Sequence, residues 1–223
     1  YADAQGVVHD PTGGGLDDVR KGRVIFIGDA STRIREDYLR ILRFFRFNAW
    51  YARGPLDPTG LSACADLVAG LDALSVERIW KEVKKLLAAP DPRAAWEAMK
   101  AIEVVAHVLP ELSNEARLDA LVSLEVDLML PVDAMTRVAA ALTDQESAKA
   151  LARRLKLSNE ERDRLVAALG DDVKLTSYMS LREMRRAIYK LGNEAFSDRI
   201  KLAWADGGGE KAQQWRALVA HGQ

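Results

Sequence analysis

The sequence predicts a mainly α-helical protein with a short β segment at its N-terminus. From residue 28 onward, apolar residues recur at the three- and four-residue spacing of helices in almost every segment. Proline breaks this pattern at Pro90, Pro110 and Pro131, which predicts packed helices with short connections. The first 27 residues have short apolar runs around glycines instead. A chain of 223 residues is long enough for one large or two small domains with hydrophobic cores.

The N-terminal segment is predicted to form two short strands within residues 1–10 and a third at residues 23–27. The first two strands flank a turn near Gln5 and Gly6. Three strands with so little apolar content cannot form an independent sheet, so this segment is interpreted as the end of a larger domain. By composition alone, the glycines between these strands predict a plain loop.

Residues 28–51 are predicted to form one continuous helix. At helical spacing Ile34, Ile41, Leu42, Phe45 and Ala49 lie on one side, and further apolar residues cover much of the remainder. A helix that is apolar nearly all round is a buried helix.

Arginine recurs at every third position of this helix, at Arg40, Arg43 and Arg46. Buried guanidinium groups without partners would destabilise the helix strongly. An anion must therefore meet them, and it is either a carboxylate of the protein or a phosphate of a ligand.

Asp37 and Arg40 suggest how a base could be recognised. Asp37 is placed in the early turns of the predicted helix, where its dipole favours negative charge, and the two residues are neighbours at this spacing. An acceptor beside a donor complements the amino group and ring nitrogen that cytosine and adenine present. Each bidentate contact can discriminate by about 1–3 kcal/mol. The alternative is an ordinary ion pair within the helix.

Further helices are predicted along the rest of the chain. Ser75 is the expected N-cap of a helix at residues 75–88, with Ile79, Val83, Leu86 and Leu87 on its core face. A short apolar segment reaches Leu109. The other predicted helices span residues 93–101, 113–130, 133–142, 144–155, 158–169, 181–191, 194–205 and 210–220.

Two basic clusters in the C-terminal half are candidates for binding a phosphate backbone. The second has helical spacing, with Tyr189 beside it. For each cluster, the alternative is a solvated surface. The residues are Arg153, Arg154 and Lys156 in the first cluster, and Arg182, Arg185 and Arg186 in the second.

Composition limits the possible classes of protein. A formal net charge of -1 argues against a globally basic nucleic-acid binder, so RNA contacts must come from local patches. The single cysteine, Cys64, rules out an internal disulfide framework and is expected to be a small core residue. No membrane-spanning run or signal sequence is visible, and a cytoplasmic protein is expected.

The stretch GDASTRIREDYLRILRFFRF at residues 28–47 closely resembles the neck-helix signature of the class II tRNA nucleotidyltransferases. These are the CCA-adding enzymes, and bacterial poly(A) polymerases are their close relatives. The resemblance implies that the EDxxR element, from Glu36 to Arg40, reads the incoming CTP or ATP. The implied nucleotide-binding residues are Asp37, Arg40, Arg43 and Arg46.

Other stretches resemble further parts of this family. Residues 75–82 match an S-x-E-R-I-x-x-E pattern, and Leu151–Leu165 is similar to the far part of these enzymes. Residues 1–11 are similar to the final hairpin of the catalytic head, and residues 10–18 to its flexible loop. The resemblance implies flexible-loop positions at Gly14, Gly15 and Asp18, and neck support from Arg33, Glu36, Glu77, Arg78 and Glu82.

The resemblance implies a division into a head remnant (1–27), a neck (28–90), a helical body (91–143) and a tRNA-binding tail (144–223). It implies tRNA, CTP and ATP as partners and Mg²⁺ held by a carboxylate pair in the head. No such pair occurs in residues 1–27, because the adjacent Asp17 and Asp18 diverge on an extended chain. We therefore expect no catalytic or metal-binding residues here, and no activity without the head.

The sequence leaves several functions open. A CCA-adding enzyme is the leading interpretation, and the features that separate it from CC-only or A-only enzymes lie largely in the head. A bacterial poly(A) polymerase is the nearest alternative. A non-catalytic helical adaptor that binds RNA or a protein is a further one, but it does not explain why so apolar a helix keeps an arginine row.

Overall fold

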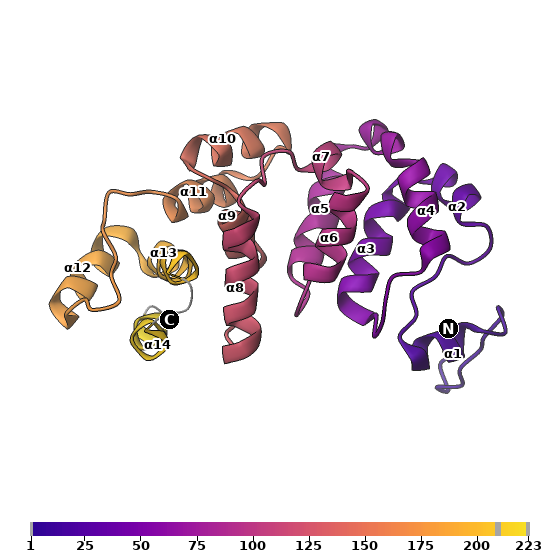
Figure 1. Cartoon of the computed structure of the whole chain (residues 1–223), viewed down its shortest axis with the longest axis horizontal. Helices are drawn as coiled ribbons and strands as arrows, with labels where there is room; N and C mark the ends of the chain where they lie inside the picture. The colour runs from indigo at the N-terminus through magenta and orange to yellow at the C-terminus, as the bar shows by residue number, and fades with distance from the viewer. Residues whose placement is uncertain (1, 208–210, 222–223) are drawn as a thin grey trace. The chain divides into compact units, whose positions relative to one another are not determined.

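A computed structural model describes residues 2–207 and 211–221 and divides the chain into two compact units, Tyr1–Val108 and Leu109–Gln223 (Figure 1). The predicted divisions after residues 27, 90 and 143 fall inside these units and stay predictions. Within the described residues, no helix combines the length and hydrophobicity needed to cross a bilayer.

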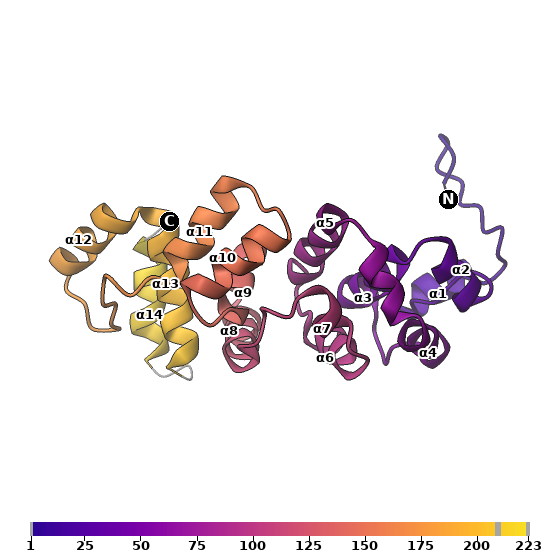
Figure 2. The same ribbon diagram turned by 90° about the horizontal axis from the view of Figure 1, so that it is seen from above.

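Unit 1 is built around α3 (Leu39–Tyr51), which packs against α5 (Val76–Leu87) and α6 (Arg93–Ala101) (Figures 1 and 2). Ile41 and Phe45 of α3 are fully buried, and so is Ile34 of the preceding helix. The other helices of unit 1 are α1 (Gly15–Lys21), α2 (Ala30–Glu36), α4 (Pro58–Asp66), the 3₁₀ helix η1 (Val68–Ala73) and α7 (Val104–Val108).

The prediction of one helix over residues 28–51 is wrong, because the chain breaks at Asp37. This residue has an extended backbone (φ -159°, ψ 105°) and ends α2, and its carboxylate accepts the N–H of Leu39 at 3.1 Å. Aspartate competes for backbone N–H groups in this way, which favours a helix boundary over a helix interior. Asp37 therefore lies at a junction between two helices rather than in the early turns of one.

The three predicted N-terminal strands are not formed in the described part of residues 1–27. One isolated antiparallel bridge joins Ala2 and Val8, and residues 23–27 are irregular. Val7, Val8 and Ile25 are about half exposed, so these segments bury too little apolar surface to hold a sheet together.

Part of the predicted glycine loop is also helical. α1 begins at Gly15, with Asp17 and Asp18 in its first turn, where the helix dipole favours acids. Gly22 ends it in the left-handed conformation (φ 63°), a common glycine C-cap. Asp18 therefore lies on a short helix, and only residues 10–14 remain a loop.

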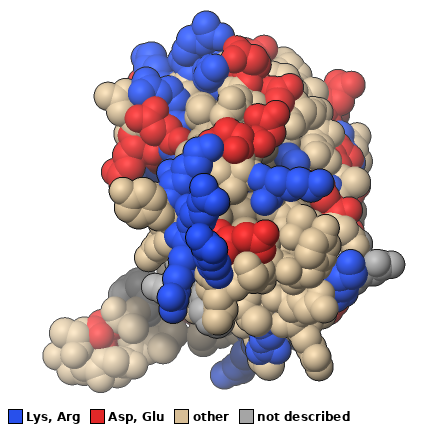
Figure 3. All heavy atoms as spheres, turned by 90° about the vertical axis from the view of Figure 1, so that its left-hand side faces the viewer, with Lys and Arg blue, Asp and Glu red and all other residues tan. Residues whose placement is uncertain are grey.

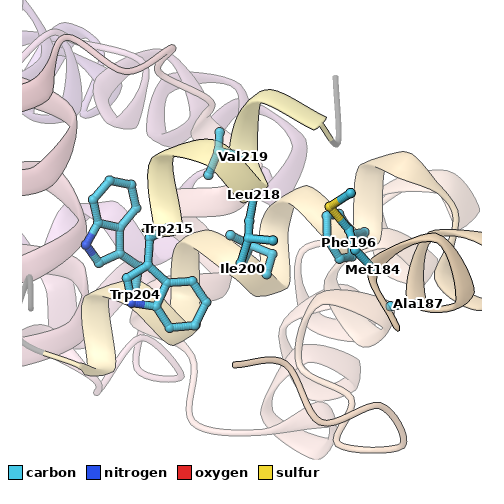
Figure 4. Packing of buried hydrophobic residues seen from close by; sticks show 8 residues of the cluster. All are labelled: Met184, Ala187, Phe196, Ile200, Trp204, Trp215, Leu218 and Val219. Carbon is cyan, nitrogen blue, oxygen red and sulfur yellow. The ribbon is translucent and has the colours of Figure 1, made fainter. Parts of the chain in front are cut away.

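Unit 2 is built around α13 (Asn193–Asp206), which packs against α8, α9, α11, α12 and α14. Figure 4 shows the hydrophobic cluster that α12, α13 and α14 share, with Phe196, Ile200 and Trp204 of α13 at its centre. The other helices are α8 (Glu115–Leu128), α9 (Ala134–Ala141), α10 (Gln145–Arg154), α11 (Asn159–Ala168), α12 (Leu181–Leu191) and α14 (Ala212–His221). Residue 210, the predicted start of the last helix, lies outside the described residues.

Several local predictions are confirmed. The helix predicted at residues 93–101 is α6, and the one at residues 181–191 is α12. Ser75 is the N-cap residue of α5 by position, although its side chain makes no capping hydrogen bond. Cys64 is fully buried in α4, and burial raises the pKa of its thiol to about 12.

Candidate nucleotide and RNA-binding residues

Asp37 is held as a carboxylate at the junction between α2 and α3. Its Oδ1 accepts the N–H of Leu39, and Nη2 of Arg78 donates to both oxygens at 3.0 and 2.8 Å. Burial raises the pKa of Asp37, but the Leu39 N–H and the Arg78 guanidinium lower it by a larger amount. The pKa therefore lies below its ordinary value. The side chain is 26% exposed. A carboxylate accepts about four hydrogen bonds, so Asp37 keeps acceptor capacity toward solvent.

Arg40 is oriented by a different carboxylate. Its Nη1 donates to Glu36 Oε2 at 2.5 Å and to the Arg33 carbonyl at 2.6 Å. Arg33 donates to the same Glu36 oxygen, so Glu36 joins the two arginines. Nε and Nη2 of Arg40 donate to none of the described residues, and the side chain is 26% exposed. Arg40 therefore keeps two donor groups for another molecule.

Arg43 and Arg46 share one buried partner, Glu82 of α5. The distance from Arg46 Nη1 to Glu82 Oε2 is 2.9 Å, and from Arg43 Nε to Glu82 Oε1 it is 3.6 Å. The side chain of Glu82 is 5% exposed, whereas those of Arg43 and Arg46 are 45% and 15% exposed. The expectation of a fully buried arginine row is wrong, because the row emerges at one edge of the α3–α5 contact. Carboxylates of the protein meet these arginines.

The site combines predicted and unexpected pairings. Asp37 and Arg40 do not pair through their side chains, which removes the simple intrahelical ion pair as an explanation of their spacing. The carboxylate that reaches Arg40 is Glu36, at i,i+4 spacing, a signal that the sequence contained. Arg78 and Glu82 both hold α3 and its junction from α5, and Glu77 lies in the first turn of α5.

A cavity in unit 1 lies at the other end of α3. Its volume is about 760 Å³, and its walls include the predicted loop residues Gly14, Gly15 and Asp18 as well as Phe47 and Trp50. The four predicted nucleotide-binding residues are not among its lining residues. The exposed aromatic end of α3 was not predicted, because the apolar pattern alone does not show which face stays open.

The two basic clusters of unit 2 differ in how much of their charge is already paired. Arg154 makes a bidentate contact with Glu111, at 2.6 and 2.7 Å, whereas Arg153 and Lys156 are exposed. All three arginines of the second cluster lie on the outer face of α12 and are exposed: Arg182, Arg185 and Arg186. Figure 3 shows a band of Lys and Arg side chains on the side of the molecule that carries α12.

The described residues do not fit the Mg²⁺ centre that the resemblance implies. Within residues 2–207 and 211–221, no three His, Cys, Asp or Glu side chains are grouped so as to hold a metal ion. Asp17 instead pairs with Lys21 at 2.8 Å, and both Asp17 and Asp18 pair with Arg23.

Comparison with known proteins identifies the family. A family model described as "Probable RNA and SrmB-binding site of polymerase A" matches residues 55–115. The chain is 36% identical over 155 residues to the mitochondrial CCA tRNA nucleotidyltransferase 1 of Homo sapiens, an alignment that covers 67% of this chain and 35% of the human protein. It is 39% identical over 114 residues to the CCA-adding enzyme of Streptococcus gordonii, which covers 51% of this chain and 28% of that enzyme.

The chain thus spans about a third of the length of the curated relatives it matches. The neck-helix resemblance, the α5 residues that hold α3 and these relatives agree with one another. The chain therefore belongs to the family of the CCA-adding tRNA nucleotidyltransferases and poly(A) polymerases.

Proposed function

We propose that this chain supplies base selection and tRNA binding in an enzyme that adds CCA to tRNA 3′ ends from CTP and ATP. The observation that carries the proposal is the α2–α3 junction. There an ionised Asp37, fixed by Arg78, lies three residues before an Arg40 that keeps two donor groups. The names of the relatives support the same activity.

Base selection follows from the chemistry of these two side chains. The free acceptor capacity of Asp37 suits the amino group of cytosine or adenine, and the free N–H groups of Arg40 suit the adjacent ring nitrogen. Uracil and guanine present a carbonyl oxygen in place of the amino group, and a carboxylate repels it. A buried acceptor left unpaired in this way costs about 1–3 kcal/mol, which is enough for selection.

Arg43 and Arg46 are placed for a supporting role. Arg43 is the more exposed, and its contact with Glu82 is long, so it can turn toward a phosphate at little cost. Arg46 is nearly buried, keeps a close contact with Glu82, and lies over the ring of Phe47 at 4.3 Å. We therefore assign phosphate contact to Arg43 and anchoring of α3 to Arg46.

The test is nucleotide preference measured by equilibrium binding of CTP, ATP, UTP and GTP to the chain. We expect CTP and ATP to bind more tightly than UTP and GTP, and Asp37→Ala to abolish this difference. Asp66→Asn, at an exposed position of α4, is the matched control and should leave the preference unchanged. Equal binding of all four nucleotides by the parent chain would contradict the proposal and favour the adaptor.

A poly(A) polymerase is the second candidate, because the family model that matches residues 55–115 carries the name of polymerase A. The same measurement separates the two functions. A poly(A) polymerase is expected to prefer ATP over CTP, whereas a CCA-adding enzyme must accept both.

A further inference from the structure

Helix α12 has two opposite faces with the same residue spacing. The inner face contributes to the core of unit 2 through residues at i, i+3, i+4 and i+7, namely Met184, Ala187, Ile188 and Leu191. The outer face repeats this spacing two residues earlier, with Arg182, Arg185, Arg186 and Tyr189. Tyr189 is 94% exposed, so the outer face lies open to solvent.

The three arginines, which we call the arginine stripe, have no carboxylate partner within the described residues. Glu183 lies beside them on α12, but its side chain accepts from the N–H and hydroxyl of Ser180, at 2.8 and 2.7 Å, and caps the helix. Like charges at i,i+3 and i,i+4 spacing destabilise a helix. The stripe is therefore suited to an external anion.

A cavity of about 470 Å³ adjoins the stripe, between α12 and residues 172–179. Arg186 belongs to both, and Lys174 and the exposed ring of Tyr178 also line the cavity. Asp172 in its wall is paired with Lys190 at 3.0 Å and with Arg199 at 2.8 Å. Glu183 also lines the cavity, so its walls carry two carboxylates and the three cations Lys174, Arg186 and Lys190.

We propose that the arginine stripe and this cavity form one RNA-binding surface. The stripe contacts phosphates, and the cavity takes one unpaired nucleotide whose base stacks on Tyr178. The choice of tRNA as the RNA rests on the proposed function, but the surface itself rests on α12 and the cavity.

Three observations favour RNA with an unpaired nucleotide. Aromatic rings beside a basic groove are the usual arrangement for binding single-stranded nucleic acid. The cavity falls within the roughly 300–1,000 Å³ of small-molecule sites, which is enough for a nucleotide. A continuous duplex keeps its bases stacked on one another and offers none to the exposed ring of Tyr178, whose described partner is Lys211 Nζ at 5.8 Å from the ring centroid.

The test compares two RNAs of equal length, a tRNA transcript and a fully paired duplex, in fluorescence-anisotropy titrations over a range of salt. The triple change Arg182→Gln, Arg185→Gln and Arg186→Gln should weaken binding of both RNAs. It should also lower the slope of log K against log salt by about 2–3. The control triple Lys149→Gln, Arg162→Gln and Arg216→Gln removes the same charge elsewhere in unit 2 and should have a smaller effect.

Tyr178→Ala should weaken tRNA binding about 5- to 150-fold, the range measured for one stacked base, and leave duplex binding unchanged. Tyr178→Phe keeps the ring and should restore tRNA binding. Equal effects of the two triple variants would overturn the phosphate contacts. An equal effect of Tyr178→Ala on both RNAs, or no effect on either, would overturn the nucleotide cavity.

Failure here is distinguishable from failure of the proposed function. If the CTP and ATP preference is present but the stripe variant binds tRNA normally, only the RNA surface is wrong. If the stripe behaves as expected but the four nucleotides bind equally, only base selection is wrong.

Discussion

Glu125 and Arg137 form a fully buried ion pair in unit 2. Arg137 Nε donates to Glu125 Oε2 at 2.6 Å, and both side chains are 0% exposed. Oε1 of Glu125 accepts no hydrogen bond from the described residues, and burial raises its pKa despite Arg137 and Lys201. Such a pair contributes little net stability but is costly to break, because removal of one partner leaves a buried charge.

We expect Arg137→Met to lower the free energy of unfolding by about 3–5 kcal/mol. The double variant Glu125→Leu/Arg137→Met should recover most of this loss, because it removes both charges and keeps similar volume. Urea denaturation of the three proteins measures the difference. A double variant as unstable as the single one would show that the pair is required for packing as well as for charge balance.

Asp133 makes the free energy of unfolding depend on pH in the acid range. Burial raises its pKa, but the Thr136 N–H and Arg164 lower it more, so the net pKa lies below the ordinary 3.8. A carboxyl group with a lowered folded pKa stabilises the protein above its unfolded pKa and loses this effect as the pH falls through the folded value. The contribution of Asp133 is thus complete well above pH 3.8 and is lost only as the pH falls below 3.8, through the lowered folded pKa.

Asp133→Asn isolates this effect, because an asparagine can still cap α9 but does not titrate. We expect the parent to be more stable than the variant at pH 6 and the difference to shrink as the pH falls below 3.8. Urea midpoints at a series of pH values measure it. A constant difference over this range would assign the stabilisation to groups other than the Asp133 carboxylate.

At the scale of elements, the break between α2 and α3 is the feature that places Asp37. The chain turns at Asp37, and the following residue, Tyr38, packs its ring against Gly70 of η1 so closely that a β-carbon there would overlap the ring. The junction is therefore held from α5 by Arg78 and from η1 by the contact at Gly70.

Gly70→Ala is expected to lower stability by about 1–3 kcal/mol, because the added methyl group forces Tyr38 to move. It should also reduce the proposed preference for CTP and ATP, because Tyr38 directly follows Asp37, the residue that we propose reads the base. Gly54→Ala is the control, since no atom lies within 4 Å of its added β-carbon. Thermal unfolding and nucleotide binding of both variants provide the two measurements.

At the scale of the whole molecule, periodicity predicted most helices of both units, because each buries one face along its length. The ends of α6 and α12 were predicted to the residue. The prediction of one helix over residues 28–51 is wrong because apolar periodicity continues across Asp37. The hydrogen bond from the Leu39 N–H to the Asp37 side chain favours a break in the helix there. The prediction of N-terminal strands is wrong because strand propensity alone does not form a strand where no sheet is present to pair with it.

The assignment of the candidate site residues stays a prediction, and their pairings could not be predicted from the sequence. The sequence motif singled out the arginine row and Asp37, and the resemblance indicated support from Arg78 and Glu82. The sequence could not show that Glu82 is shared by Arg43 and Arg46, because this sharing depends on how α5 packs on α3. The cavity beside α12 was also beyond prediction, since one of its walls is an irregular segment.

The burial of Cys64 makes the chain convenient for covalent probes. Its thiol is inaccessible and un-ionised at neutral pH, so it should stay inert toward maleimides. A cysteine introduced by Tyr189→Cys, at an open position, would then be the reactive thiol of this chain. A photo-crosslinker attached there could report which nucleotides of a bound RNA pass over α12, with no background from the native sequence.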